Sequence, residues 1–149
     1  DGQHDPKFVN DLIKPLVGDE ADLVIGSRFL KYSYKMPSAK KIGVSIFNSL
    51  IWALTGYKIT DPVSGYRGFN RELLEILATD IYPTDFPDAD LLITLIRGGV
   101  RVKEVPVRMY PPPKTKKPMH QGIVTYYYIF KVFLSMLVGL IRSKKLRNI

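Results

Sequence analysis

The first part of the chain has apolar side chains at the spacing of an amphipathic helix. Pro6 suits a first helical turn because its missing N–H would have no partner there, and Gly18 is typical of the residue after a helix. The apolar positions between these two residues are Phe8, Val9, Leu12, Ile13 and Leu16. The pattern predicts a short helix with one buried face.

A compact apolar run follows this helix. It extends from Leu23 to Ile25 and ends at Gly26, which predicts a buried strand that leads into a loop. Residues 28–41 mix cations with aromatic side chains and one proline, a composition typical of a mobile basic surface loop. A long helix is then expected from the end of this loop to Gly56.

The next part of the chain combines turn, strand and helix signals. Turn-forming residues from Asp61 to Gly65 precede a strand-like stretch and then a helix, which should extend from Asn70 to about Leu77. Asn70 is a favourable N-cap because its side chain can accept a hydrogen bond from the first helical turn.

A further helix, capped by Asp88, should end at the glycines 98–99, and residues 100–110 then alternate apolar and polar side chains. This alternation is the clearest strand signal in the chain. Because strands alternate with helices, the sequence predicts an α/β fold with a largely parallel or mixed sheet. The stretch "PPPKTKKP" at 111–118 predicts an extended, exposed linker.

The C-terminal part of the chain is apolar over residues 122–141, where Lys131 is the only charge, and the basic stretch "RSKKLR" follows. This length could cross a bilayer, although a lysine near the middle would be costly. An interfacial helix with its basic end on anionic headgroups is an equal alternative. A core or dimer-interface helix is a third.

Composition narrows the possible chemistry. The 149 residues are 46% hydrophobic, which fits one folded domain. Cysteine is absent, so any metal ion needs oxygen or imidazole ligands. The formal net charge of +8 predicts an anionic partner: nucleic acid, a phosphorylated small molecule or an acidic membrane leaflet.

Two groups of residues are candidates for phosphate chemistry. Asp1 and Gln3 lie two apart in a glycine-containing loop and could face one hard cation beside a diphosphate, although a turn role explains the aspartate as well. Arg28 follows the predicted buried strand, where ligands gather in open α/β sheets. The alternative for Arg28 is an ion pair with a nearby acid. The cations that follow it are Lys31, Lys35, Lys40 and Lys41.

Acidic residues elsewhere also have two interpretations. Asp88 and Asp90 resemble a general-base pair, but Asp88 is equally placed as a helix cap, and residues two apart do not share a helix face. Asp61 and Arg67 flank a tight turn, and a structural Asx-turn explains Asp61 as well as a ligand role does.

Four stretches, in this order and spacing, carry a family resemblance: "DGQHDP", "DLVIGSRF", "ITDPVSGYRGFNRELLE" and "GGVRVKEVPVRMYPP". Together they resemble the family 2 glycosyltransferases, most nearly the dolichol-phosphate mannosyltransferase and polyprenyl-phosphate glycosyltransferase branch. The resemblance covers residues 1–112 and implies the acceptor side of a catalytic domain, the second half of a GT-A-type, Rossmann-like mixed sheet flanked by helices. Residues 113–118 would be a linker, and residues 119–149 a hydrophobic or amphipathic helix at a membrane or interface, with a basic tail.

The same resemblance implies that the chain starts within a domain. In that family another acid precedes the opening motif, giving Asp-x-Asp, and the half that binds the nucleotide lies upstream. Asp1 would be the second acid of this motif. We therefore expect this chain to be inactive on its own.

The resemblance also implies roles for individual residues. Asp1 and Gln3 would hold Mg²⁺ or Mn²⁺ and the donor diphosphate. Arg28 would meet the acceptor phosphate, and the basic loop after it would act as an acceptor lid. Further polar positions implied for the site, with substrate-binding or catalytic roles, are Lys31, Lys35, Lys40, Asp61, Ser64, Asp88 and Asp90.

The implied reaction is transfer of a hexose from a nucleotide-sugar donor to a lipid-phosphate acceptor, with inversion, on the cytoplasmic face of a membrane. An anionic membrane surface and a homodimer are expected partners, and nucleic acid is not, because no nucleic-acid motif is present. The alternatives are a basic module that binds an anionic membrane or nucleic acid, and a dimerisation fragment without catalysis.

Overall fold

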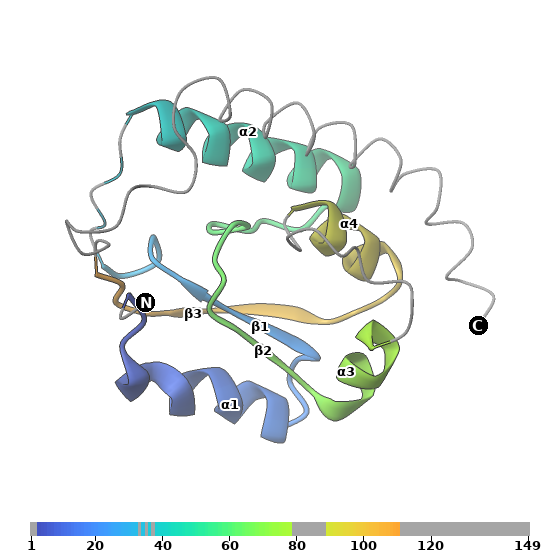
Figure 1. The fold of residues 1–149 in the computed structure, drawn as a ribbon. Helices are drawn as coiled ribbons and strands as arrows, with labels where there is room; N and C mark the ends of the chain where they lie inside the picture. Colours follow the sequence, from blue (N-terminus) through green and yellow to red (C-terminus); the bar gives the residue numbers. More distant parts are fainter. Residues whose placement is uncertain (1–2, 33, 35, 37, 79–88, 111–149) are drawn as a thin grey trace.

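The computed structural model describes residues 3–32, 34, 36, 38–78 and 89–110. These residues form an α/β fold in which four α-helices surround a three-stranded sheet (Figure 1). In chain order the elements are η1 (Pro6–Phe8), α1 (Val9–Val17), β1 (Leu23–Ser27), α2 (Ser38–Thr55), β2 (Arg67–Phe69), α3 (Arg71–Leu77), α4 (Ala89–Arg97) and β3 (Val102–Pro106).

The sheet is mixed, as the sequence predicts. Its strand order is β2-β1-β3, so the first strand of the chain lies at the centre. β1 pairs antiparallel with β2, with Leu23 opposite Phe69, and parallel with β3, with Leu23 opposite Val102. All five residues of β1 are buried, which explains the apolar run from Leu23 to Ile25.

Helices cover both faces of this sheet. Leu23 and Ile25 pack in a cluster with residues of α2, α3 and α4, whereas Val24 packs in a second cluster with Leu12 of α1. The alternation follows from the strand geometry, in which successive side chains point to opposite faces. Figure 1 shows α1 on one side of the sheet and α2 on the other.

Three predicted helices are confirmed with their ends. α1 ends at Val17 with Gly18 as its C-cap, and α4 is followed by the glycines, of which Gly99 has a φ of 94° that favours glycine. α3 begins after Asn70, whose side chain accepts a hydrogen bond of 2.8 Å from the N–H of Leu73. This contact is the N-cap expected from the sequence.

Two predicted boundaries are wrong. Residues 38–41 belong to α2 and not to the basic loop, because Ser38 is a good first residue for a helix and the alanine and lysines after it have high helix propensity. β3 covers only Val102–Pro106 of the strand predicted over residues 100–110. Its partner β1 ends at Ser27, whose O accepts a last hydrogen bond of 3.0 Å from Val107 N. Further along, an isolated antiparallel bridge joins Met109 to His4.

Some expectations fall outside the described residues: the linker at 113–118, the helix and basic tail at 119–149, and the cap of α4 at Asp88. Of the helices in the described part of the chain, none combines the length and apolar character needed to span a bilayer.

Candidate functional site

Polar side chains gather where β1 and β3 end. These two strands are parallel, so their carboxyl ends meet at the same edge of the sheet, where α/β proteins bind ligands. Arg28 follows β1, and residues 107–110 follow β3. The turn over residues 60–66 lies beside both, since Tyr66 O accepts a hydrogen bond of 2.8 Å from Gly26 N.

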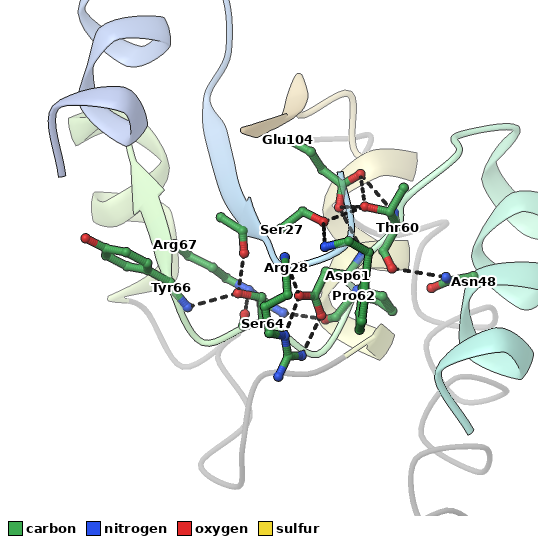
Figure 2. Close-up of polar contacts among 12 residues, drawn as sticks. Ser27, Arg28, Asn48, Thr60, Asp61, Pro62, Ser64, Tyr66, Arg67 and Glu104 are labelled. Carbon is green, nitrogen blue, oxygen red and sulfur yellow. Dashed lines mark hydrogen bonds and ion pairs between the residues drawn. The ribbon is translucent and has the colours of Figure 1, made fainter. Parts of the chain in front are cut away.

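Arg28 and Asp61 form a two-pronged ion pair at this edge. Nε of Arg28 lies 2.7 Å from Oδ2 of Asp61, and Nη2 lies 2.7 Å from Oδ1. The backbone N–H of Arg28 also donates to Oδ2, at 3.1 Å. The Asp61 side chain is fully buried and that of Arg28 is 14% exposed. Figure 2 shows the pair among its polar neighbours.

This pair fixes the charge and the direction of Arg28. Burial disfavours the charged guanidinium, but the hydrogen bonds and the charge of Asp61 outweigh burial and raise the pKa of Arg28. Arginine has five N–H donors, and the fork uses only Nε and one hydrogen of Nη2. Tyr34 forms a further hydrogen bond with the guanidinium, so a ligand would share its remaining hydrogens with Tyr34.

Ser64 and Arg67 hold the turn that carries Asp61. The Ser64 hydroxyl donates to Gly26 O at 2.7 Å, which fastens the turn to β1. Nε of Arg67 donates to Ser64 O at 2.8 Å, and its Nη2 donates to Pro62 O at 2.7 Å. Ser64 is therefore a buried residue that shapes the turn, and its hydroxyl is occupied by the backbone of β1.

Glu104 and Thr60 complete the network, and sequence reasoning missed both. Glu104 accepts hydrogen bonds from the backbone N–H groups of Thr60 and Asp61, at 2.8 and 2.9 Å. Burial raises the pKa of Glu104, although these backbone hydrogen bonds oppose the effect. A signal was present in the sequence: Glu104 lies two residues after Val102, so the two side chains share one face of the strand. Because Val102 packs against the core, a charged residue on that face is unusual.

A pocket of about 270 Å³ opens beside the ion pair. Its lining contains two arginines, three tyrosines and two apolar residues: Arg28, Tyr32, Tyr34, Val107, Arg108, Met109 and Tyr110. Arg28 lies 5.1 Å from the centre of the Tyr34 ring, and Arg108 lies 5.1 Å from that of Tyr32. Among the residues that the structure describes, no carboxylate lines this pocket.

The opening loop borders the same pocket. Gln3 O accepts a hydrogen bond of 2.9 Å from the backbone N–H of Tyr110, and His4 packs on Tyr66 with ring centres 4.8 Å apart. Burial lowers the pKa of His4, and the charge of Arg28 lowers it further, so both favour the neutral imidazole. Gln3 thus contacts Tyr110, one of the residues that line the pocket together with Arg28.

The predicted site residues divide into three groups. Arg28, Asp61 and Ser64 lie together, and Gln3 contacts the pocket residue Tyr110 through its backbone. Lys31 is exposed on the loop after Arg28, whereas Lys40 lies on α2 and Asp90 on α4. Asp1, Lys35 and Asp88 lie outside the described residues.

The predicted metal site depends on one residue that is not described. Within residues 3–32, 34, 36, 38–78 and 89–110, no group of three or more histidine, aspartate or glutamate side chains could hold a metal ion. The proposed ligands are instead an oxygen pair, from Asp1 and the Gln3 amide, which is the donor type that Mg²⁺ prefers.

Comparison with known proteins supports the resemblance found in the sequence. The chain is 31% identical over 140 residues to an uncharacterized protein of Methanocaldococcus jannaschii, and the match covers 90% of this chain and 56% of the relative. It is 29% identical over 141 residues to the UDP-N-acetylglucosamine–dolichyl-phosphate N-acetylglucosaminyltransferase of Methanococcus voltae, covering 93% of this chain and 55% of the relative.

A third relative is named for a similar acceptor. The dolichyl-phosphate hexose transferase of Haloferax volcanii is 34% identical over 104 residues, which cover 68% of this chain and 42% of the relative. The chain therefore spans about half the length of the relatives it matches. No protein-family model matches it.

Proposed function

Since this chain is a relative of family 2 glycosyltransferases of the polyprenyl-phosphate type, we propose that the protein transfers a sugar from a nucleotide-diphosphate sugar to a dolichyl or other polyprenyl phosphate. The acceptor phosphate would bind in the pocket at the carboxyl ends of β1 and β3. Its oxygen would attack the anomeric carbon, the bond to the donor diphosphate would break, and the configuration would invert.

The observation that carries this proposal is the lining of the pocket, which has two arginines and no carboxylate among the described residues. A phosphate monoester has a second pKa of about 6, so it is already largely ionised at pH 7. Such an acceptor needs cations to position it and no base to deprotonate it, whereas a hydroxyl acceptor would need a base.

The role of Asp61 follows from its hydrogen bonds. Both of its oxygens are bonded to Arg28, so the carboxylate fits the role of a holder for the guanidinium better than that of a base. With Nε fixed, the outer hydrogens of Arg28 can bind phosphate oxygens in the planar geometry that arginine favours. Arg108 adds a second cation, and the lysines of the loop would close over the acceptor.

A divalent cation, Mg²⁺ or Mn²⁺ held by Asp1 and Gln3, would stabilise the charge of the departing diphosphate when bound. The site would then have a donor side and an acceptor side. The opening loop would face the donor, and Arg28 would face the acceptor. The bridge between His4 and Met109 fits this arrangement because it joins the opening loop to the pocket wall.

The proposal extends to the wider protein. The mixed sheet is consistent with the second half of a GT-A-type domain, and the acceptor implies a place at the cytoplasmic face of a membrane. The tail at 119–149 is the proposed anchor. If a version without residues 119–149 floats with anionic vesicles as well as the intact protein does, the tail is not the anchor.

Transfer assays on three variants of the full-length protein test the acceptor chemistry. We expect Arg28→Ala to lose at least about a hundredfold in kcat/KM for a polyprenyl phosphate, because it removes a charge-assisted contact to phosphate. Asp88→Ala and Asp90→Ala should lose much less. Arg71→Ala is the control, since Arg71 is an exposed arginine that pairs with Glu75 along α3. Strong loss at the aspartates with little loss at Arg28 would reject a lipid-phosphate acceptor.

A further inference from the structure

Glu104 is a charged residue in the middle of a strand that packs in the core. It lies opposite Ile25 of β1 in the parallel register, and Ile25 is fully buried. A carboxylate at such a position is costly unless hydrogen bonds satisfy it, and an apolar residue would serve the sheet as well or better. The position therefore calls for an explanation other than stability.

The Glu104 carboxylate binds one dipeptide at several points. Its Oε2 accepts from Thr60 N at 2.8 Å and its Oε1 accepts from Asp61 N at 2.9 Å. The Thr60 hydroxyl lies 3.0 Å from both carboxylate oxygens. On its other side, Thr60 O accepts from the Asn48 side chain at 3.2 Å. The N–H, the carbonyl and the hydroxyl of Thr60 thus all form hydrogen bonds. Asp61 is held in position by the bond from its backbone N–H to Glu104 (Figure 2).

The charge of Glu104 also sets the direction of a chain of hydrogen bonds. An ionised carboxylate can only accept, so the Thr60 hydroxyl must donate to it. The Thr60 oxygen then accepts from the Ser27 hydroxyl, 2.6 Å away. The Ser27 oxygen in turn accepts from the N–H of Phe29, at 3.2 Å. One carboxylate on β3 therefore orders the start of the loop that follows β1.

These contacts converge on Arg28 from both sides. Ser27 precedes it, Phe29 follows it, and Asp61 binds its guanidinium and its backbone N–H. We propose that Glu104 is a positioning residue that, through Thr60, holds the Arg28–Asp61 pair in the geometry that receives the acceptor phosphate. The proposal rests on the proposed function of the pocket and adds to it a residue that does not itself contact the ligand.

The arrangement of charges supports a positioning role. Asp61 and Glu104 are two carboxylates in one partly buried network, and Arg28 is the guanidinium that bonds the Asp61 carboxylate. Burial raises the pKa of Glu104, which shows that the environment does not favour its charge. Because burying this carboxylate is unfavourable, we expect Glu104 to have a role in positioning the residues that it binds.

Thr60→Val in the full-length protein tests this directly, because valine keeps the shape of threonine and removes only the hydroxyl between Ser27 and Glu104. We expect the KM for a polyprenyl phosphate to rise about tenfold, as for one lost hydrogen bond to a charged group. The kcat and the KM for the nucleotide sugar should stay within about twofold of wild type, since neither depends on this contact. Thr60→Ser, which retains the hydroxyl, should behave as wild type.

Glu104→Gln provides an independent second variant. An amide can accept through only one of its two arms, so one backbone N–H of residues 60–61 loses its acceptor, and the rise in acceptor KM should exceed that of Thr60→Val. The double variant should be no worse than Glu104→Gln alone, because both changes break one chain of bonds. Glu75→Gln is the matched control, since Glu75 is a glutamate exposed on α3.

The outcomes separate this proposal from the proposed function. If wild-type protein makes no lipid product, the proposed function fails and the positioning role falls with it. If wild type is active and Thr60→Val leaves the acceptor KM unchanged, only the positioning role is overturned. It is also overturned if the KM values for donor and acceptor rise together with a lower Tm, or if the two substitutions act additively, because those results describe a purely structural residue.

Discussion

Two arginines of this protein bind aspartate in the same way at opposite ends of the sheet. Arg28 donates from its backbone N–H and from Nε to one oxygen of Asp61, and from Nη2 to the other. Arg101 does the same to Asp22, with distances of 2.9, 3.1 and 2.7 Å. The first pair lies at the carboxyl ends of the parallel strands and the second at their amino ends.

Burial distinguishes the two pairs. The side chains of Arg28 and Asp61 are 14% and 0% exposed, whereas those of Arg101 and Asp22 are 46% and 20% exposed. An exposed pair is screened by water and contributes little, while removing one member of a buried pair leaves a charge without compensation. The exposed Arg101–Asp22 pair therefore links two strand ends. The buried Arg28–Asp61 pair has the same geometry and fixes a charged side chain in the lining of the pocket.

The largest expected effect is from Asp61→Ala. It leaves the Arg28 guanidinium largely buried without its partner, which should lower the free energy of unfolding by about 3–5 kcal/mol. Urea denaturation of the full-length protein measures this loss. A loss no greater than that of Asp22→Ala would contradict the distinction between the two ends of the sheet.

Gly26→Ala should have the next largest effect, because the pocket end of the sheet is tightly packed. A Cβ at Gly26 would lie 3.0 Å from both methyl groups of Val107 and 3.1 Å from Tyr66 O. We expect a loss of about 1–3 kcal/mol in the same denaturation experiment. Gly43→Ala on α2 is the control: its Cβ would meet nothing within 4 Å, so it should stabilise the helix instead.

Asp22→Asn should have a smaller effect that depends on pH. Hydrogen bonds from Arg101 lower the pKa of Asp22, so the native state binds this proton less readily than the unfolded state does. The stability that Asp22 contributes is therefore present at neutral pH and is lost as the pH falls below its ordinary value of about 3.9. Thermal melts should show a lower Tm for Asp22→Asn at pH 7, a gap that narrows towards pH 3, and unchanged transfer. A difference in Tm between wild type and Asp22→Asn that stays the same from pH 7 to pH 3 would contradict a stabilising Asp22–Arg101 ion pair.

Arg71→Ala should have the smallest effect. Arg71 is 92% exposed and pairs with Glu75 one helical turn away, a contact that water and salt screen. Neither the Tm nor the kcat/KM for a lipid phosphate should change measurably. A clear loss of transfer would mean that arginines act through overall charge and not through their place at the pocket.

The sequence allowed much of the fold to be predicted because the signals were local. The helix spacing before Gly18, the apolar run of β1 and the cap at Asn70 each depend on a few neighbouring residues. The start of α2 was misplaced because the lysines of residues 38–41 suit a basic loop and a helix equally well. β3 is shorter than the alternation predicts because its partner β1 ends at Ser27, and the length of a partner strand is not visible in the local pattern of β3.

The site was less predictable because its contacts join distant residues. Arg28 and Asp61 were both candidates, but nothing local shows that they bind each other across 33 positions. The roles of Thr60 and Glu104 depend on the register of β3 against β1, which places the carboxylate beside a turn 43 or 44 positions earlier. The sequence identifies residues that could form a phosphate site, but the register of the sheet determines which of them come into contact.

Isothermal titration of the full-length protein with a soluble short-chain polyprenyl phosphate, and with the matching alcohol, tests the central claim most directly. A pocket built from Arg28 and Arg108 should bind the phosphate and not the alcohol, and Arg28→Ala should abolish this preference. Equal binding of phosphate and alcohol, or a preference that survives the loss of Arg28, would contradict the assignment of this pocket to the acceptor phosphate.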